Sequence, residues 1–502
     1  MNVWIDRAPG AGDGLGAPVA EPPVYRQIAE RIRAEIAAGE LGAGARLPPI
    51  RQLARSLGVH RDTVALAYET LAAEGVVESQ VGRGTFVRTM APAPAAPVAL
   101  RLSASAERLL EVERALPRYA AGEDTIPLHA LMPDPSLFPV EAFRRSVNRA
   151  LAHGGAALLG YGEPQGHAGL REVLAQRLRG AGVAAAAESL VLCQGASQGI
   201  ALALRLLADP GDHVAVEEPT YQNALTAIEG LGLHPAPVPM GPDGLDLDAL
   251  ERVLARPEVR LLYTIPTFHN PLGVTTSLAH RRAVLALAAR HGKAVVEDAY
   301  EMDLRFEGRP VPPLAALDES GLVVLLTSFS KSLFPGLRIG AVLARGRLVD
   351  ALLVLRHVSD LGGALPLQAA LADFVACGGY ERHLASLRRE LRARRDVMLE
   401  ALAAHMPEGA RWTRPEGGLQ LWLELPEPVD SRDVFADALR VGVLIAPGHQ
   451  FLADRRPSRG VRLSLSLAGA AEIREGVARL GRALAARRDA GARGGRRAPV
   501  HV

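Results

Sequence analysis

The chain has 502 residues, too many for one ordinary hydrophobic core, and its length predicts about two to four domains. Its formal net charge is +2 at pH 7, which excludes a global positive field, so any nucleic-acid site must be local. Two cysteines exclude a disulfide framework and a zinc site, no metal site is expected, and no apolar run approaches membrane-spanning length. The opening residues lack the pattern of a signal peptide, so we expect a soluble cytoplasmic protein.

The amino-terminal part of the sequence predicts three short helices and a hairpin. Residues 1–20 are rich in Gly, Pro and Ala, and we expect a flexible tail. After Val24, isoleucines recur at helical spacing, and further helices are expected over 49–56 and 60–75. Residues 76–87 predict a tight β-hairpin.

The order helix, turn, helix and hairpin is typical of a winged helix-turn-helix domain, which we assign to residues 21–88. Gly58 supplies the sharp corner between the second and third helices. Side chains at the helix starts and at the hairpin tip are expected to meet bases and phosphates. They are Arg51, His60, Arg61, Thr63, Arg83 and Gly84. A small helical cap with a solvated arginine face is the alternative interpretation.

This domain resembles the GntR-type winged helix. The core LPxxRxLAxxLGVxRxTVxxAYxxLxxEG and the wing GxGTFV match almost continuously from Val24 to Val87. The resemblance implies binding to double-stranded operator DNA. His60 stands where many members have serine, so the resemblance does not give the operator sequence.

Residues 89–124 are expected to link this domain to the rest of the chain. They begin with a Pro/Ala stretch, APAPAAP, which extends rather than packs. The following region, 98–124, is polar and partly helical, and we interpret it as further connector.

From residue 125 onward, short apolar strands alternate with amphipathic helices, which is typical of an α/β domain with a mostly parallel central sheet. We assign this large domain to residues 125–362. Arg- and Leu-rich helices followed by two more strands predict a smaller α+β subdomain over 363–486. The basic, Gly-rich stretch 487–502 is expected to be disordered. Ligands of such sheets bind at the carboxyl ends of the strands.

Lysine is almost absent from this sequence. Of 57 residues that are Lys or Arg, only Lys293 and Lys331 are lysines, a shortage that genomic composition bias also explains. Lys331, however, lies in SFSKSLFPGLRIG after an apolar strand. Arginine holds anions well, whereas condensation with an aldehyde requires a primary amine. Lys331 therefore indicates a lysine-bound aldehyde cofactor, of which pyridoxal 5′-phosphate (PLP) is the common one.

The phosphate of such a cofactor needs hydrogen-bond donors and positive charge. Ala196 and Ser197 follow a strand and open a helix, where backbone N–H groups are available. Ser328 and Arg338 flank the lysine and offer a hydroxyl and a guanidinium.

The pyridine ring needs a carboxylate at its nitrogen and donors at its phenolic oxygen. Asp298, at a strand end, is the candidate for the nitrogen, and Tyr300 and Asn270 are the candidates for the oxygen. Tyr221 offers an aromatic face for ring stacking. Each also has a plain structural interpretation as a helix cap, a turn or a core residue.

The segments that carry these residues resemble fold-type I aminotransferases. TIPTFHNPLG, VVEDAYEMDLRF, SFSKSLFPGLRIG and YGEPQGHAGLRE match over essentially 125–485. The resemblance implies that Lys331 forms the internal aldimine, Asp298 pairs with the ring nitrogen, and Asn270 and Tyr300 hold the ring oxygen. It also implies that the phosphate is held by four residues: Ser328, Arg338, Ser197 and the backbone of Ala196.

The same resemblance extends to the substrate side and to the quaternary structure. Arg462 matches the arginine that binds an α-carboxylate. Tyr161 matches a residue that reaches the cofactor of the neighbouring subunit, which implies a homodimer, with or without domain swapping. Leu131-Met132-Pro133-Asp134 stands where many relatives have a glycine, so the shape of the substrate side is not carried over.

A winged helix linked to an aminotransferase-like domain resembles the MocR subfamily of GntR-type regulators. The resemblance implies a PLP-dependent, DNA-binding transcriptional regulator that senses an amino compound, or PLP itself, through an aldimine at Lys331. The alternative is a functional PLP-dependent aminotransferase that carries a DNA-binding domain. A structural relic that binds no PLP is the third hypothesis.

Overall fold

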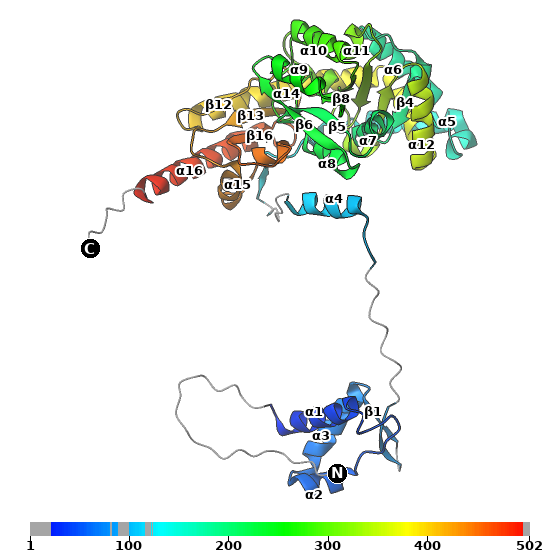
Figure 1. Cartoon of the computed structure of the whole chain (residues 1–502), viewed down its shortest axis with the longest axis vertical. Helices are drawn as coiled ribbons and strands as arrows, with labels where there is room; N and C mark the ends of the chain where they lie inside the picture. Colours follow the sequence, from blue (N-terminus) through cyan, green and yellow to red (C-terminus); the bar gives the residue numbers. More distant parts are fainter. Residues whose placement is uncertain (1–21, 81–82, 89–99, 116–121, 123, 495–502) are drawn as a thin grey trace. The chain divides into compact units, whose positions relative to one another are not determined.

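The computed structural model describes residues 22–80, 83–88, 100–115, 122 and 124–494 (Figure 1). The chain divides into two compact units, Met1–Arg101 and Leu102–Val502. The predicted tail over 1–20 and the Pro/Ala stretch of the linker lie outside the described residues. No helix in the described part of the chain is both long and apolar enough to cross a bilayer.

The first unit is a winged helix-turn-helix domain, as the sequence predicted. Three helices precede an antiparallel hairpin: α1 (Val24–Ala37), α2 (Ile50–Leu57), α3 (Arg61–Ala73), β1 (Val77–Gln80) and β2 (Gly84–Val87). Gly58 adopts a φ of +66° directly after α2, where a glycine costs no steric strain, and turns the chain toward α3. Buried side chains of all three helices, among them Ile32, Leu53 and Leu71, form the core that positions α3.

The structure differs from the prediction within the expected linker. Residues 104–115 form helix α4 (Ala104–Ala115), which packs against helix α8 (Gln222–Gly230) in the second unit. Val112 of α4 is buried, and Ser105 and Arg108 hydrogen-bond to carbonyls at the end of α8. This part of the linker is therefore a docked helix, because its one apolar face finds a partner far away in the sequence.

The second unit is built on an eight-stranded mixed sheet (Figure 1). In spatial order its strands are β4 (Leu190–Cys193), β11 (Gly340–Leu343), β10 (Val323–Ser328), β9 (Ala294–Asp298), β8 (Val259–Thr264), β5 (His213–Glu218), β6 (His234–Gly241) and β7 (Gly244–Leu245). The neighbours from β10 to β6 pair in parallel, whereas β11 is antiparallel to both of its neighbours. The predicted α/β architecture is confirmed.

Helices cover both faces of this sheet. Besides α8 they are α5 (Val140–Gly154), α6 (Ala168–Gly180), α7 (Ala196–Leu207), α9 (Leu247–Leu254), α10 (Leu278–Arg290), α11 (Leu314–Leu317), α12 (Arg347–Asp360) and α13 (Leu365–Ala376). Successive residues of β4 alternate between two hydrophobic clusters, Leu190 and Leu192 in one, Val191 and Cys193 in the other. Because side chains alternate across a strand, these clusters lie on opposite faces.

A smaller sheet lies in the carboxy-terminal part. Its strands are β12 (Arg411–Trp412), β13 (Gln420–Glu424), β16 (Gly460–Ser464) and β15 (Ala446–Pro447), accompanied by α14 (Gly379–His405), α15 (Ser431–Arg440) and α16 (Ala470–Gly494). Strand β3 (Ile126–Pro127) pairs with β14 (Val443–Leu444), and Ile126 and Leu128 belong to the core of this part. The first residues assigned to the large domain therefore pack with the smaller one.

The predicted disordered tail also differs in part. Helix α16 continues to Gly494, so residues 487–494 are helical. The Arg487 side chain binds Asp433 and Asp437 of α15, and these ion pairs favour continuation of the helix. Residues 495–502 lie outside the described residues.

Candidate functional site

The candidate site is a cavity of ≈ 200 Å³ at the carboxyl ends of β4, β9 and β10. Its lining residues are Leu131, Ala196, Ser197, Tyr221, Gln222, Asn270, Asp298, Tyr300, Ser328, Ser330, Lys331, Arg338 and Arg462. Every residue predicted to contact the cofactor or a ligand carboxylate is among them except Tyr161, which is 91% exposed. Gln222 and Ser330 are additional; their only sequence signal is proximity to Tyr221 and Lys331.

Lys331 follows β10, and its Nζ donates a hydrogen bond to the carbonyl oxygen of Leu131. Burial lowers the pKa of Lys331; Glu301 opposes this effect, and the charges of Arg462 and Arg338 add to it. A lowered pKa leaves more of the amine unprotonated, which is the form that attacks a carbonyl.

Asp298 ends β9 and is 1% exposed. The Tyr263 hydroxyl donates to Oδ2 at 2.8 Å, whereas Oδ1 has no hydrogen-bond partner among the described residues. Burial raises the pKa of Asp298 to about 6. A buried carboxylate with one unpartnered oxygen fits the protonated ring nitrogen of PLP, because that positive charge favours the ionised carboxylate.

Tyr300 and Asn270 each retain a hydrogen-bond donor. Gln420 Nε2 donates to the Tyr300 hydroxyl oxygen at 3.1 Å, which leaves the hydroxyl proton for another acceptor. Asn270 Oδ1 accepts from Arg462 Nη1 at 3.0 Å, which leaves the amide Nδ2 as a donor. Both residues line the cavity, so two donors fit the phenolic oxygen of a PLP ring.

The first turn of α7 forms an anion site at one end of the cavity. Gly195 precedes the helix with a φ of +79°, and no side chain from the described residues caps it, so the first N–H groups remain available. A Cβ at Gly195 would lie 2.9 Å from Nη2 of Arg338, so only glycine lets this guanidinium approach. The hydroxyls of Ser197 and Ser328 complete a set of donors suited to a phosphate.

Arg462 lies on β16 with 9% exposure. Its Nη2 donates to the carbonyl oxygen of His129 at 2.7 Å, and its Nε has no partner among the described residues. Burial lowers the pKa of Arg462 to about 10. A buried guanidinium with a spare donor favours the arrival of a carboxylate.

The segment 129–131 accepts hydrogen bonds from two of the three cationic side chains that line the cavity, Lys331 and Arg462. His129 accepts from Arg462 and Leu131 accepts from Lys331, each through a backbone carbonyl. Ala130, between them, accepts hydrogen bonds from Ser464 at 2.7 Å and Ser466 at 3.0 Å. A covalent bond to the Lys331 amine would remove its hydrogen bond to Leu131, and a carboxylate bound to Arg462 would compete with the His129 carbonyl. Either event would therefore loosen the segment 129–131.

Glu301 is a candidate that sequence reasoning missed. It is fully buried, its Oε2 accepts from the Leu419 backbone at 3.3 Å, and its charge acts on Lys331. Burial raises the pKa of Glu301 to about 8. A Cβ at Gly418 would lie 2.7 Å from Glu301 Oε2, so only a glycine fits against this carboxyl group. Gly418 is far from Glu301 in the sequence, and no local sequence pattern reveals the contact.

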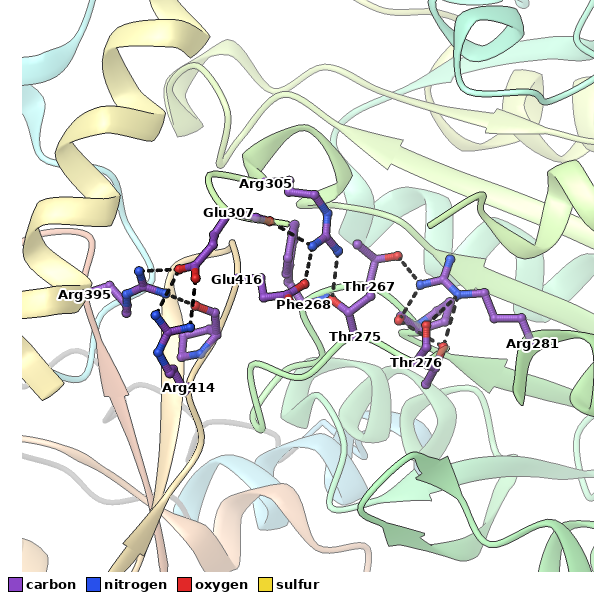
Figure 2. A network of polar contacts seen from close by, with 12 residues as sticks. Thr267, Phe268, Thr275, Thr276, Arg281, Arg305, Glu307, Arg395, Arg414 and Glu416 are labelled. Carbon is purple, nitrogen blue, oxygen red and sulfur yellow. Dashed lines mark hydrogen bonds and ion pairs between the residues drawn. The ribbon is translucent and has the colours of Figure 1, made fainter. Parts of the chain in front are cut away.

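A buried arginine holds the loop that carries Asn270 (Figure 2). Arg281 of α10 donates to Pro266 O and Thr267 Oγ1 at 2.8 Å, and also to Thr276. It therefore ties together both ends of the loop 266–276. Figure 2 also shows Arg305 over the Phe268 ring of this loop.

A chain of ion pairs continues from this loop toward α14 (Figure 2). Arg305 binds Glu416, and Glu307 binds Arg395 at 2.6 Å and Arg414 at 3.1 Å. The side-chain hydrogen bonds from Arg395 and Arg414 lower the pKa of Glu307 to about 2. The contacts connect the loop of Asn270 with the carboxy-terminal part.

In the first unit, four of the six residues predicted to bind DNA are exposed and the other two, Thr63 and Gly84, are half-buried. Arg51, Arg61 and Arg83 are exposed, and Thr63 is half-buried in the first turn of α3. His60 caps α3, with its Nδ1 accepting from the Asp62 backbone at 3.4 Å. The start of α3 therefore presents polar and basic groups together.

Arg46 is a second residue that sequence reasoning missed. It forms an isolated antiparallel bridge with Phe86 of β2. Gly84 has a φ of +115°, and a Cβ there would lie 2.8 Å from Arg46 Nε. The glycine predicted at the wing thus makes room for an exposed guanidinium beside the wing.

Comparisons with known proteins match both units. The family of aminotransferase class I and II matches residues 132–480, and the gntR family of bacterial regulatory proteins matches residues 24–87. The probable rhizopine catabolism regulatory protein MocR of Rhizobium meliloti is 33% identical over 94% of this chain and 96% of its own length. The chain belongs to the MocR subfamily of GntR-type regulators.

Two further proteins are similar to this MocR-type chain, one over nearly its whole length and one over the aminotransferase-like part. The uncharacterised HTH-type transcriptional regulator YdcR of Escherichia coli is 32% identical and covers 91% of this chain and 98% of its own length. The solved structure of LysN, an α-aminoadipate aminotransferase of Thermus thermophilus complexed with N-(5′-phosphopyridoxyl)-L-leucine, is 32% identical with a TM-score of 0.70. It covers 77% of this chain and 97% of its own length. The MocR-type chain thus unites a DNA-binding domain with an aminotransferase fold.

Proposed function

We propose that this regulator binds PLP covalently at Lys331 and that its affinity for operator DNA depends on what occupies the surrounding cavity. The observation that carries the proposal is the buried Oδ1 of Asp298, which none of the described residues partners, in the same cavity as a lysine amine of lowered pKa. A helix start suited to phosphate lies in the wall of that cavity. The chain that holds this cavity also carries a winged helix.

When bound, PLP supplies a carbonyl for covalent attachment and an electron-poor ring. The Lys331 amine would provide the attachment point, and Asp298 would hold a proton on the ring nitrogen. Tyr300 and Asn270 would donate to the phenolic oxygen, and Tyr221 would offer its ring for stacking. The start of α7, together with Ser197, Ser328 and Arg338, would hold the phosphate.

The effector is a small amino compound or PLP itself. The Lys331 amine is the group that an effector amine would replace at the cofactor carbonyl, and Arg462 would exchange the His129 carbonyl for a carboxylate of the same compound. Both events change the hydrogen bonds of the segment 129–131. A ligand shifts a conformational equilibrium only if it binds two conformations with unequal affinity. The exchange of hydrogen bonds at the segment 129–131 is where the two affinities would differ.

The active assembly is a homodimer. Tyr161 is 91% exposed, and Leu159, two residues before it, is 73% exposed, so both side chains are accessible to a second subunit. If a second subunit covers these side chains, Tyr161 of one subunit lies near the cofactor of the other. The two winged helices of the dimer then bind the two half-sites of an operator. Analytical ultracentrifugation of wild type and Tyr161→Ala tests this arrangement: wild type should sediment as a dimer, and the variant should dissociate more readily. A monomeric wild type would refute the dimer.

A spectroscopic and a DNA-binding measurement test the proposal together. Purified protein incubated with PLP should absorb visible light, and borohydride should leave a reduced adduct on the peptide that contains Lys331. The same protein should retain specific duplexes from a random DNA pool, with an affinity that falls as salt rises. A colourless protein, or one without sequence preference, refutes the proposal.

Catalysis is the second candidate, because Lys331, Asp298 and Arg462 line the cavity together as transamination requires. Steady turnover of an amino donor with a 2-oxo acid, at a rate above free PLP, would favour it. DNA binding that responds to PLP without turnover favours regulation alone.

A further inference from the structure

Helix α4 caps the carboxyl end of α8 (Figure 1). The last carbonyls of a helix have no partner within it and carry partial negative charge. Ser105 donates its hydroxyl proton to the carbonyl of Gly230, and Arg108 Nε donates to the carbonyl of Glu229 at 3.3 Å. The Glu229 carbonyl also accepts from the Gly232 N–H at 3.0 Å, so the side chains of α4 add hydrogen bonds at the end of α8, one of them with a positive charge that complements the helix dipole.

Apolar packing supports the same contact. A Cβ at Gly230 would lie 2.9 Å from Leu109 Cδ2, so the glycine allows Leu109 to rest on the end of α8. Val112, one turn further along α4, is 8% exposed. Ser105, Leu109 and Val112 share one face of α4 because residues at these spacings fall on one side of a helix.

The other end of α8 reaches the cavity. Tyr221 is the residue directly before α8, Gln222 is its first residue, and both line the cavity around Lys331. A helix of this length spans about 13 Å and moves as a unit, because its backbone hydrogen bonds fix it internally. Displacement of its first residues therefore displaces Gly230 and the contacts with α4.

We infer that α4 is the element through which occupancy of the cavity reaches the winged helix. A ring stacked on Tyr221 shifts the start of α8, the end of α8 shifts with it, and α4 moves or undocks. The chain that leaves α4 toward lower numbers is the linker to the DNA-binding domain. This inference rests on the proposed function and names the part of the chain that carries its signal.

The test compares full-length Leu109→Asp with the matched variant Leu110→Asp. Leu109 is 38% exposed and Leu110, the next residue, is 43% exposed, but successive residues of a helix lie about 100° apart, and it is Leu109 that a Cβ at Gly230 would meet. The dissociation constant for a duplex that wild type selects from a random pool is measured with and without PLP. PLP uptake, followed by visible absorbance, should be the same in all three proteins.

The expected result is a PLP-dependent change of about five-fold or more in wild type and in Leu110→Asp, and of less than about two-fold in Leu109→Asp. The double variant Ser105→Ala, Arg108→Ala should lose the response in the same way. An undiminished response in Leu109→Asp overturns the inference while the proposed function stands. A wild type that binds PLP and DNA but shows no response overturns both.

Discussion

Lys331 gains its proposed role from its surroundings. Burial together with the charges of Arg462 and Arg338 lowers its pKa, and its Nζ makes a hydrogen bond to a backbone carbonyl that covalent attachment can replace. The other lysine, Lys293, is used differently: its Nζ donates to Val259 O at 2.6 Å and to Arg256 O at 3.2 Å. The two lysines therefore offer a matched pair of variants.

Lys331→Ala should abolish visible absorption after incubation with PLP, because an alanine offers no amine for covalent attachment. Lys293→Ala should retain the absorption, since its amine holds a turn and does not line the cavity. Circular dichroism should show that both variants are folded. A reducible adduct that persists in Lys331→Ala would contradict the assignment.

Asp298→Asn should stabilise the protein in the absence of PLP and weaken PLP binding. The folded pKa of about 6 lies above the ordinary 3.8, so the contribution of Asp298 to stability is greatest below about pH 4 and is lost as pH rises toward 6. An asparagine removes this loss, which is worth up to about 3 kcal/mol at pH 7.5. Thermal unfolding of the PLP-free proteins at pH 4 and pH 7.5 measures the difference, and an equal gap at both pH values would argue against a buried, strained carboxylate.

At the scale of elements, loops and helix ends position the side chains and N–H groups of the two candidate sites. Arg281 of α10 ties the ends of the loop 266–276 and thereby places Asn270 beside Arg462. The first turn of α7 carries the N–H groups that we propose bind the phosphate, and the first turn of α3 carries Arg61 and Thr63, which we propose contact DNA.

Arg281→Met should destabilise the second unit by roughly 3 kcal/mol, because buried carbonyls and hydroxyls at both ends of the loop lose a charged donor. The displaced Asn270 should also weaken PLP binding. Arg282→Met is the control, since Arg282 is the next residue and is exposed. Denaturant unfolding measures the stability of both variants, and titration with PLP measures their affinity for it. Equal stability and equal PLP affinity in the two variants would show that the loop does not depend on Arg281.

Arg61→Ala should weaken binding to the selected duplex about ten-fold and reduce its salt dependence, without changing PLP uptake. Arg33→Ala removes the same charge from α1, where the arginine pairs with Glu74 at 2.8 Å, and should have little effect. Equal losses in the two variants would mean that charge alone, and not the start of α3, sets DNA affinity.

The sequence predicted the elements whose signals are local and missed those whose partners are distant. Several residues of the cavity were predictable because they stand at strand ends, as Asp298 and Ser328 do, and Lys331 stood out against an arginine-rich background. Helix α4 was interpreted as connector because its partner surface on α8 lies more than a hundred residues away in the sequence. Glu301 was missed for the same reason, since Gly418 and Leu419 enclose it from the carboxy-terminal part.

At the scale of the whole molecule, two units that bind different partners share one chain, Met1–Arg101 and Leu102–Val502. The first belongs to a DNA-binding family and the second to an aminotransferase family. A regulator of this kind works only if the state of one unit alters the affinity of the other, so a coupling free energy between PLP and DNA is the quantity that defines it.

That coupling is measured by one experiment: the dissociation constant for the selected duplex, with and without PLP, in wild type and in Lys331→Ala. We predict a change of about five-fold or more in wild type and none in the variant. The same change in both proteins, or no change in either, would contradict the account.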